Sequence, residues 1–190
     1  MIQARYFSTS GVEIRDLIKA WIAIILVFTI FLKPELHSYS AAALVSFISV
    51  SIGFILHELA HKVVAQHYGC FAEFRAFTGM LALSIILAFF GIIFIAPGAV
   101  FISGPVGKRR NGIISAAGPL TNIVLAGIFL VVRSFIDNPI TSYGVSINGW
   151  LALFNMIPFG PLDGAKIWRW NQFIFGVMAI IALIIVYGVR

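Results

Sequence analysis

Long apolar runs, separated by short polar stretches, make up most of this chain. They are unbroken, whereas the strands of a membrane barrel would alternate apolar and polar residues. Because a bilayer offers backbone groups no water, unbroken runs predict helices that satisfy their own hydrogen bonds. The pattern predicts an all-α membrane protein, a polytopic helical bundle of about five to six transmembrane segments, with apolar runs at residues 17–32, 41–65, 80–96, 113–132, 145–158 and 173–189.

Composition agrees with a membrane location. Of the 190 residues, 61% are hydrophobic and 11% are charged, and the mean hydropathy of +1.02 lies outside the range of soluble domains. We find no internal repeat or linker, so residues 1–190 are interpreted as a single integral membrane domain. The single cysteine, Cys70, excludes an internal disulfide.

Two polar stretches are expected outside the apolar runs. Residues 1–16 are interpreted as a cytoplasmic tail or a short surface helix, and residues 67–78 as a polar turn. Run 17–32 follows basic residues and precedes Ser38-Tyr39-Ser40, so a cleaved signal peptide is the alternative for this segment. We favour a retained transmembrane helix, because the later helices alone would form a thin bundle.

The formal net charge of +6 is carried by short basic clusters between the apolar runs. Clusters in these places set membrane topology, so we exclude a nucleic-acid partner. A cytoplasmic N-terminus leaves only Lys33, Arg133 and Arg190 outside. The other ten of the 13 basic residues then lie on the cytoplasmic side: Arg5, Arg15, Lys19, Lys62, Arg75, Lys108, Arg109, Arg110, Lys166 and Arg169.

This orientation requires residues 80–107 to cross the membrane an even number of times. The pair Pro97-Gly98 interrupts the apolar run and offers a point of reversal. The sequence therefore predicts a re-entrant hairpin near 80–107. The alternative is an ordinary sixth transmembrane helix.

Run 41–65 contains the motif H-E-x-x-H as His57-Glu58-Leu59-Ala60-His61. Residues four apart share one face of a helix, so both imidazoles can bind one metal ion with Glu58 beside them. Zinc is the usual metal of this motif. The alternative is a polar helix end with two incidental histidines.

Catalytic zinc takes three protein ligands and keeps one position open, so a third ligand is required. Of the seven Asp and Glu residues, we interpret only Glu58 and Asp163 as lying in or next to an apolar run, where charges are costly and usually functional. His67 lies on another face of the helix. We therefore predict one Zn²⁺ held by His57, His61 and Asp163, towards the cytoplasmic side of the membrane.

Two further motifs accompany H-E-x-x-H. Residues 155–164 read N-M-I-P-F-G-P-L-D-G, and residues 118–122 read G-P-L-T-N. This combination resembles the site-2 protease family of intramembrane metalloproteases, which pairs H-E-x-x-H with N-x-x-P-x-x-x-L-D-G and an intervening G-P-x-x-N helix. The match covers about residues 54–168, within a core of about 41–168. Unlike many members the chain shows no PDZ or CBS domain, and its segment 80–107 is more apolar than their short re-entrant β element.

The resemblance implies an intramembrane zinc-dependent endopeptidase. Its expected partners are the lipid bilayer and a transmembrane protein substrate, hydrolysed within or near its membrane segment, while the sequence sets no oligomeric state. Zinc would activate water and polarise the scissile carbonyl, with Glu58 as the general base. Asn122 and Asn155 are candidates to stabilise the oxyanion, and helix-to-helix hydrogen bonding is the alternative for both.

Other interpretations remain beside this one. Residues 94–103 are predicted to offer a strand edge against which an unwound substrate extends, with helix-breaking packing as the alternative. A membrane zinc protease of the prenyl-protein type takes a glutamate as third ligand, but no glutamate follows Glu73. A non-proteolytic membrane metal-binding protein, either a transporter or a scaffold that retains the fold, would not need the general base Glu58.

Overall fold

A computed structural model of the chain describes residues 2–4, 7–94 and 96–188. Arg5, Arg190 and residue 95, which enter the charge and strand predictions above, lie outside these ranges. The elements in chain order are β1 (Ile2–Ala4), β2 (Phe7–Thr9), α1 (Gly11–Leu36), α2 (Tyr39–Val45), the π-helical segment η1 (Ser46–Ser51), α3 (Ile52–His67), β3 (Phe71–Ala76), α4 (Thr78–Phe89), β4 (Gly98–Ser103), α5 (Lys108–Arg133), α6 (Pro139–Asn155), α7 (Asp163–Trp170) and α8 (Gln172–Gly188).

Three helical stretches are long and apolar enough to cross a membrane. They are Gly11–Leu36, Tyr39–His67 and Lys108–Arg133, and the second joins α2, η1 and α3. The chain is therefore a mainly helical membrane protein, as the sequence predicts. Helices α6 and α8 have 17 residues each, at the lower limit for a spanning helix, so the count of five to six spans stays a prediction.

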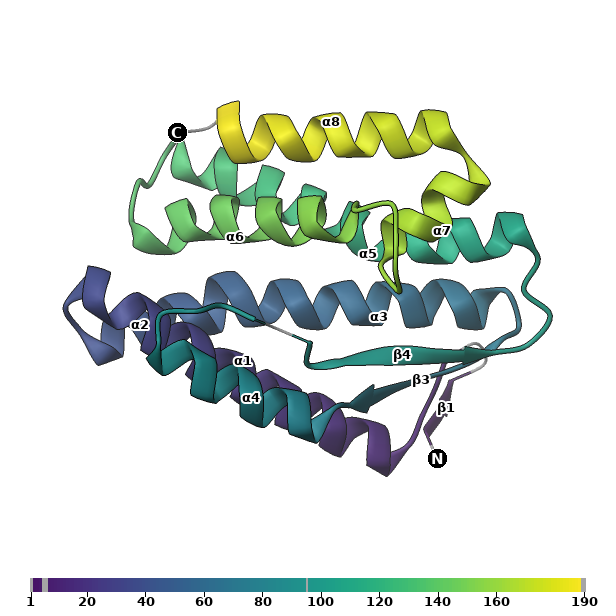
Figure 1. Cartoon of the computed structure of the whole chain (residues 1–190), viewed down its shortest axis with the longest axis horizontal. Helices are drawn as coiled ribbons and strands as arrows, with labels where there is room; N and C mark the ends of the chain where they lie inside the picture. The colour runs from purple at the N-terminus through teal and green to yellow at the C-terminus, as the bar shows by residue number, and fades with distance from the viewer. Residues whose placement is uncertain (1, 5–6, 95, 189–190) are drawn as a thin grey trace.

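Helix α3 lies in the middle of the molecule, between two groups of elements (Figure 1). Helices α5 to α8 lie on one side of it, and α1, α4 and the β3–β4 pair lie on the other. The start of α1, the end of α3 and the start of α5 lie at one end of the bundle (Figure 1). The metal-binding motif is in the middle of α3 and in the second half of the longer helical stretch Tyr39–His67, so it lies nearer this end.

Strands β3 and β4 form an antiparallel pair, from Phe71 opposite Ser103 to Ala76 opposite Gly98. The backbone N–H of Phe77 also donates to the carbonyl of Pro97 at 3.0 Å. The two ends of segment 77–97 therefore lie together, while α4 within it runs beside α1 (Figure 1). Re-entry of residues 80–107 into a membrane stays a prediction, but Pro97-Gly98 is not the expected point of reversal, because Pro97 lies opposite Phe77 where the segment returns and Gly98 begins β4.

Strand β3 corrects the expectation of a polar turn at 67–78. Only residues 68–70 make the turn, and β3 follows with Ala72 and Phe74 buried. Its partner β4 lies more than twenty residues further along the chain, beyond the reach of a local pattern. By contrast, the strand-like segment predicted within 94–103 corresponds to β4, apart from residues 94–97, which precede it.

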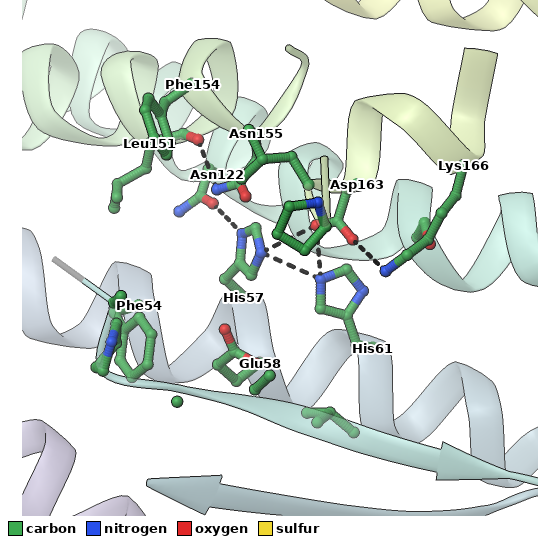
Figure 2. A pocket seen from close by; sticks show the side chains of 18 of the residues that line it. Phe54, His57, Glu58, His61, Asn122, Leu151, Phe154, Asn155, Asp163 and Lys166 are labelled. Atoms are coloured by element: carbon green, nitrogen blue, oxygen red, sulfur yellow. Dashed lines mark hydrogen bonds and ion pairs between the residues drawn. The ribbon is translucent and has the colours of Figure 1, made fainter. Parts of the chain in front are cut away.

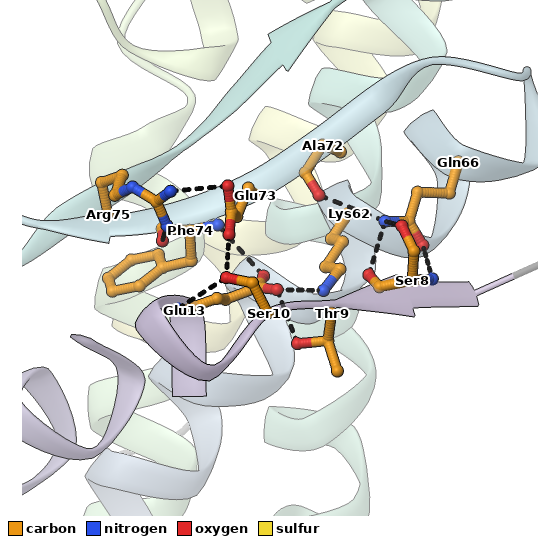
Figure 3. Close-up of polar contacts among 10 residues, drawn as sticks. All are labelled: Ser8, Thr9, Ser10, Glu13, Lys62, Gln66, Ala72, Glu73, Phe74 and Arg75. Carbon is orange, nitrogen blue, oxygen red and sulfur yellow. Dashed lines mark hydrogen bonds and ion pairs between the residues drawn. The ribbon is translucent and has the colours of Figure 1, made fainter. Parts of the chain in front are cut away.

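The N-terminal residues are also more structured than expected. Strand β1 pairs with β2, and α1 begins at Gly11, capped by the Ser10 hydroxyl, which accepts the backbone N–H of Glu13. Strand β2 lies against α3, since the backbone N–H of Ser8 donates to the Gln66 side chain at 3.1 Å. Figure 3 shows these contacts. We call β2 and the first turns of α1, residues 7–16, the N-terminal clamp.

The clamp contains a buried carboxylate that the sequence interpretation missed. Glu13 has no exposed surface and forms an ion pair with Lys62 at 2.5 Å, whose side chain is only 1% exposed. Glu13 also accepts the Thr9 hydroxyl at 2.6 Å and the backbone N–H of Phe74 at 3.1 Å. Glu58 and Asp163 are therefore not the only acidic groups in apolar surroundings, and Lys62 does not act as a surface charge.

Glu73 makes the second polar link between the clamp and β3. Its carboxylate accepts the Ser10 hydroxyl and pairs with Arg75 at 2.6 Å. The hydrogen bond from Ser10, opposed by burial and helped by Arg75, holds the pKa of Glu73 below its ordinary value. Both links fasten β3 to α1, which fixes the position of the β3–β4 pair over α3.

Candidate metal centre

Helix α3 brings the two histidines of the motif onto one face, as their spacing predicts. His57 and His61 are 5% and 7% exposed. Their Nε2 atoms lie 3.1 Å apart and their ring centroids 4.7 Å apart. Both rings point towards α5 and α7 (Figure 2).

Asp163 reaches the same point from the first residue of α7. Its Oδ2 lies 3.4 Å from His57 Nε2 and 3.0 Å from His61 Nε2. The next residue, Gly164, packs so closely on the backbone of Met156 and Ile157 that a Cβ there would collide with it. The glycine thus lets α7 start against the end of α6, which carries Asp163 to the histidines. One atom from each of these three residues can bind a metal ion, and the three atoms lie within 4.8 Å of one another.

The outer nitrogen of each imidazole has a fixed partner. His61 Nδ1 lies 2.7 Å from the carbonyl oxygen of Ile114, and His57 Nδ1 lies 2.5 Å from Oδ1 of Asn122. Both partners only accept hydrogen bonds, so Nδ1–H donates in each case. A neutral imidazole protonated at Nδ1 has its lone pair on Nε2. Both lone pairs therefore point at the carboxylate of Asp163.

This arrangement fits a metal cation. Two imidazole lone pairs and a carboxylate oxygen converge with no hydrogen among them, and a cation bound by all three would relieve their repulsion. Nitrogen and oxygen ligands of these types suit zinc, and fixed Nδ1 partners are typical of metal-bound histidines. Gly118 of α5 provides the room, since a Cβ at this residue would collide with Nε2 of both His57 and His61.

A cavity of about 370 Å³ adjoins the three residues. Most of its wall is apolar and comes from α3, β4, α5, α6 and the loop before α7, and Glu58 lines it on the β4 side of the imidazoles (Figure 2). Lys166 is the one cationic side chain among the described residues of this wall, and its Nζ lies 3.7 Å from Oδ1 of Asp163. Lys166 thus interacts with the oxygen that faces away from the histidines.

The two predicted asparagines have different surroundings. Asn122 is fully buried, with Oδ1 accepting from His57 and Nδ2 donating to the Gly53 carbonyl at 3.2 Å and to Asn148 Oδ1 at 3.1 Å. Both of its N–H groups are used, which favours the alternative of helix-to-helix hydrogen bonding. Asn155 lines the cavity and donates one N–H to the Leu151 carbonyl at 2.9 Å.

Several residues around the site were not found from the sequence. The Ile114 carbonyl is a backbone group, and Asn148 lies in an apolar run without a motif. Gly118 does belong to the G-P-L-T-N segment, so its motif was visible although its role beside the rings was not. His67, excluded as a ligand, is exposed and packs edge to face against Tyr68, and Cys70 is buried in an apolar cluster.

Comparison with known proteins finds zinc metalloproteases. The chain is 40% identical over 174 residues to "Putative zinc metalloprotease MJ0611" of Methanocaldococcus jannaschii, covering 87% of this chain and 90% of that protein. It is 28% identical over 170 residues to "Zinc metalloprotease MJ0392" of the same organism, covering 87% of this chain and 44% of that protein. It is 31% identical over 146 residues to "Putative zinc metalloprotease YwhC" of Bacillus subtilis, covering 63% of this chain and 65% of that protein. No protein-family model and no solved structure matches the chain.

Proposed function

The chain belongs to a family of zinc metalloproteases and uses zinc as its cofactor, and from this premise we propose that it is an intramembrane endopeptidase of the site-2 protease type. It hydrolyses a peptide bond within or near a transmembrane segment of a membrane-protein substrate. The three motifs that resemble this family all contribute residues to one cavity: His57 from the first, Asn122 from the second and Asp163 from the third.

One observation carries the proposal. The lone pairs of His57 and His61 and the carboxylate of Asp163 converge beside a mainly apolar cavity, and both histidines belong to a helix long and apolar enough to cross a membrane. Polar groups in a membrane-spanning helix are costly inside the bilayer, so metal ligands in such a helix are explained by a site that acts within the membrane. A substrate segment of the membrane would meet the ligands directly.

The chemistry follows from the residues around the cavity. Zinc held by His57, His61 and Asp163 supplies a Lewis acid that lowers the pKa of water towards about 7 and polarises the scissile carbonyl. The carboxylate of Glu58 accepts the proton of the attacking water and passes it to the nitrogen of the departing amine. Asn155 keeps a second N–H beyond the one given to Leu151, and this N–H stabilises the negative charge that develops on the carbonyl oxygen.

Asn122 takes a different part in this proposal. Its Oδ1 holds the Nδ1 proton of His57 at 2.5 Å, and so it orients a metal ligand. We therefore retain Asn155 as the oxyanion candidate and assign Asn122 to the support of His57.

The substrate binds along β4. A transmembrane helix hides its carbonyls in its own hydrogen bonds, so the cleaved segment has to be extended, and an extended segment can add to a free strand edge. Gly98, Ala99 and Val100 of β4 line the cavity. The opposite edge of the pair is occupied, because Glu13 and Asp16 accept the backbone N–H groups of Phe74 and Ala76 at 3.1 and 3.3 Å. Among the described residues, the edge of β4 that is not paired with β3 is the one left for a substrate.

We further propose a multi-pass protein with a cytoplasmic N-terminus and an active site towards the cytoplasmic side. Helices α1, α2–α3, α5, α6 and α8 are five candidates for crossings, although the last two have only 17 residues. The re-entrant hairpin near 80–107 is supported by the meeting of Phe77 and Pro97, which brings the two ends of its first part together.

The test is cleavage of a single-pass membrane substrate by the purified protein, with zinc content measured in parallel. Glu58→Gln should keep zinc and the fold but lower the cleavage rate at least 100-fold, since general base catalysis contributes about 10²–10⁴. His57→Ala should lose zinc, while His67→Ala on the same helix should keep both zinc and activity. Unchanged cleavage by Glu58→Gln would reject the protease mechanism, and zinc binding without any cleavage by the wild type would favour a metal-binding transporter or scaffold.

A further inference from the structure

Asn148 is a buried polar residue to which the proposed function gives no role. It lies on α6 with no exposed surface. Its side chain contacts three segments: Nδ2 donates to the carbonyls of Ser49 in η1 and Gly144 in α6, both at 2.9 Å, and Oδ1 accepts Nδ2–H of Asn122 in α5 at 3.1 Å. All hydrogen-bonding atoms of the amide except one lone pair are used.

These contacts determine which way the Asn148 amide points. The carbonyl oxygens of Ser49 and Gly144 cannot donate, so the atom that faces them has to be the NH₂ group. Oδ1 of Asn148 then faces Asn122. Because an oxygen there requires a donor opposite, Asn122 has to present its own NH₂ group, which also reaches the Gly53 carbonyl.

The orientation is passed on to the metal ligand. With its NH₂ group directed at Asn148 and Gly53, Asn122 presents Oδ1 to His57. An acceptor at that point holds the imidazole proton on Nδ1 and leaves the Nε2 lone pair free. A chain of hydrogen bonds thus runs from the carbonyls of Ser49 and Gly144 through the amides of Asn148 and Asn122 to Nδ1 of His57. This chain determines which nitrogen of His57 carries the proton.

The packing around Asn148 is specific to this arrangement. A Cβ at Gly53 would collide with Oδ1 of Asn148, so the glycine allows α3 and α6 to approach closely at this point. Gly53 also provides the carbonyl that accepts from Asn122. The π-helical segment η1 lies directly before α3 and contributes the Ser49 carbonyl.

We propose that Asn148 is a positioning residue of the metal centre, which fixes the amide of Asn122 and thereby keeps His57 in the form that binds zinc through Nε2. This inference rests on the proposed role of His57 as a zinc ligand. His61 has an independent anchor, the Ile114 carbonyl, so loss of Asn148 should affect His57 and leave His61 unchanged.

The experiment compares Asn148→Leu with Ser49→Ala. Leucine has the branched shape and the number of side-chain heavy atoms of asparagine, but it cannot accept from Asn122. The Ser49 hydroxyl donates to the Ile140 carbonyl at 2.7 Å, so Ser49→Ala removes a hydrogen bond between the same two segments without touching the chain that leads to His57. Asn148→Ser, which removes the amide without adding volume, serves as a second variant if Asn148→Leu does not fold.

Two measurements on the purified proteins test whether Asn148 positions His57. Zinc affinity is determined by competition with a fluorescent chelator, and the tautomers of His57 and His61 by nitrogen-15 NMR of the zinc-free protein. We expect the Asn148 variants to bind zinc about 10–100-fold more weakly, as is typical when a supporting partner of a ligand is lost. His57 should lose its uniform Nδ1–H form, whereas His61 keeps it and Ser49→Ala changes neither quantity.

The possible failures are distinct. Wild-type zinc affinity and an unchanged His57 tautomer in the Asn148 variants would overturn the inference while leaving the proposed metal site intact. If the His57→Ala variant bound zinc as tightly as the wild type, the proposed site would be wrong, and this inference would be wrong with it. A fall in thermal stability alone, equal to that of Ser49→Ala, would assign Asn148 a purely structural role and also overturn the proposal.

Discussion

At the scale of single residues, the proposed metal centre depends on a glycine, Gly118, as much as on its ligands. Gly118 in α5 faces the Nε2 atoms of both His57 and His61, and any Cβ at this residue would occupy the space where the two lone pairs meet. The helix itself would tolerate alanine, which is a better helix former than glycine. The glycine is therefore explained by the site and not by the helix.

Gly118→Ala should lower zinc affinity at least tenfold while the protein stays folded. The physical reason is that the added methyl group displaces one or both imidazoles from the point where Asp163 meets them. Gly127→Ala is the matched control on the same helix, because nothing lies within 4 Å of a Cβ there. Chelator competition measures the affinity, and equal zinc binding by both variants would contradict the assigned geometry.

At the scale of elements, the N-terminal clamp connects α1 to α3, which carries the two histidines, and to β3, whose partner β4 lines the cavity. Glu13 bonds both Lys62 of α3 and the backbone of Phe74 in β3, so one carboxylate joins three segments (Figure 3). Ser10 and Arg75 hold Glu73 in the same region. The clamp thus fixes β3, and through it β4, relative to α3, and both α3 and β4 line the cavity.

Glu13→Gln should lower the free energy of unfolding by about 3–5 kcal/mol, because it leaves the ammonium group of Lys62 buried without a counter-charge. The double variant Glu13→Gln/Lys62→Met removes both charges and should be more stable than the single variant. Lys19→Ala, which breaks an exposed pair with Asp16, should change stability by less than about 1 kcal/mol. Denaturant unfolding in detergent measures all three.

A double variant no more stable than Glu13→Gln would show that the two groups do not act as a pair. A small loss in Glu13→Gln alone would show that water or another group reaches Lys62 in solution. Either result would remove the reason for regarding the N-terminal residues as part of the core of the fold.

At the scale of the whole molecule, the distribution of charge agrees with the arrangement of the helices. Arg110, at the start of α5, lies over the ring of Tyr68, at the end of α3, with its guanidinium carbon 5.4 Å from the ring centre. Arg133 and Asp137 form an ion pair at the opposite end of α5. The basic cluster 108–110 and the loop 134–138 therefore lie at opposite ends of one long apolar helix.

Single cysteines at Arg109 and Asp137, introduced after Cys70 is replaced, should react with a membrane-impermeant reagent from opposite sides. We expect Arg109→Cys to be labelled only in inverted vesicles and Asp137→Cys only in intact cells, since positive residues are retained on the cytoplasmic side. Lys166→Cys should behave as Arg109→Cys does. Labelling of positions 109 and 166 from different sides would contradict the proposed topology, in which α5 and α6 both cross the membrane between these two positions.

Local patterns in the chain predict the helical membrane class and single out the residues of the proposed site. Unbroken apolar runs require helices in a bilayer, and the four-residue spacing of His57 and His61 puts both on one helix face, so these properties are local. Asp163 could be selected because a carboxylate next to an apolar run is costly without a function.

The support of the proposed site depends on how the helices pack. The partners of the two Nδ1 atoms, Asn122 and the Ile114 carbonyl, lie more than fifty residues from the histidines they orient. Burial of Glu13 depends on Lys62 and on a strand whose pairing with β4 no local pattern specifies. The hydrophobic periodicity of a segment predicts which of its faces is buried. It does not predict which distant residues will form hydrogen bonds with that segment, because those contacts form only when the helices pack.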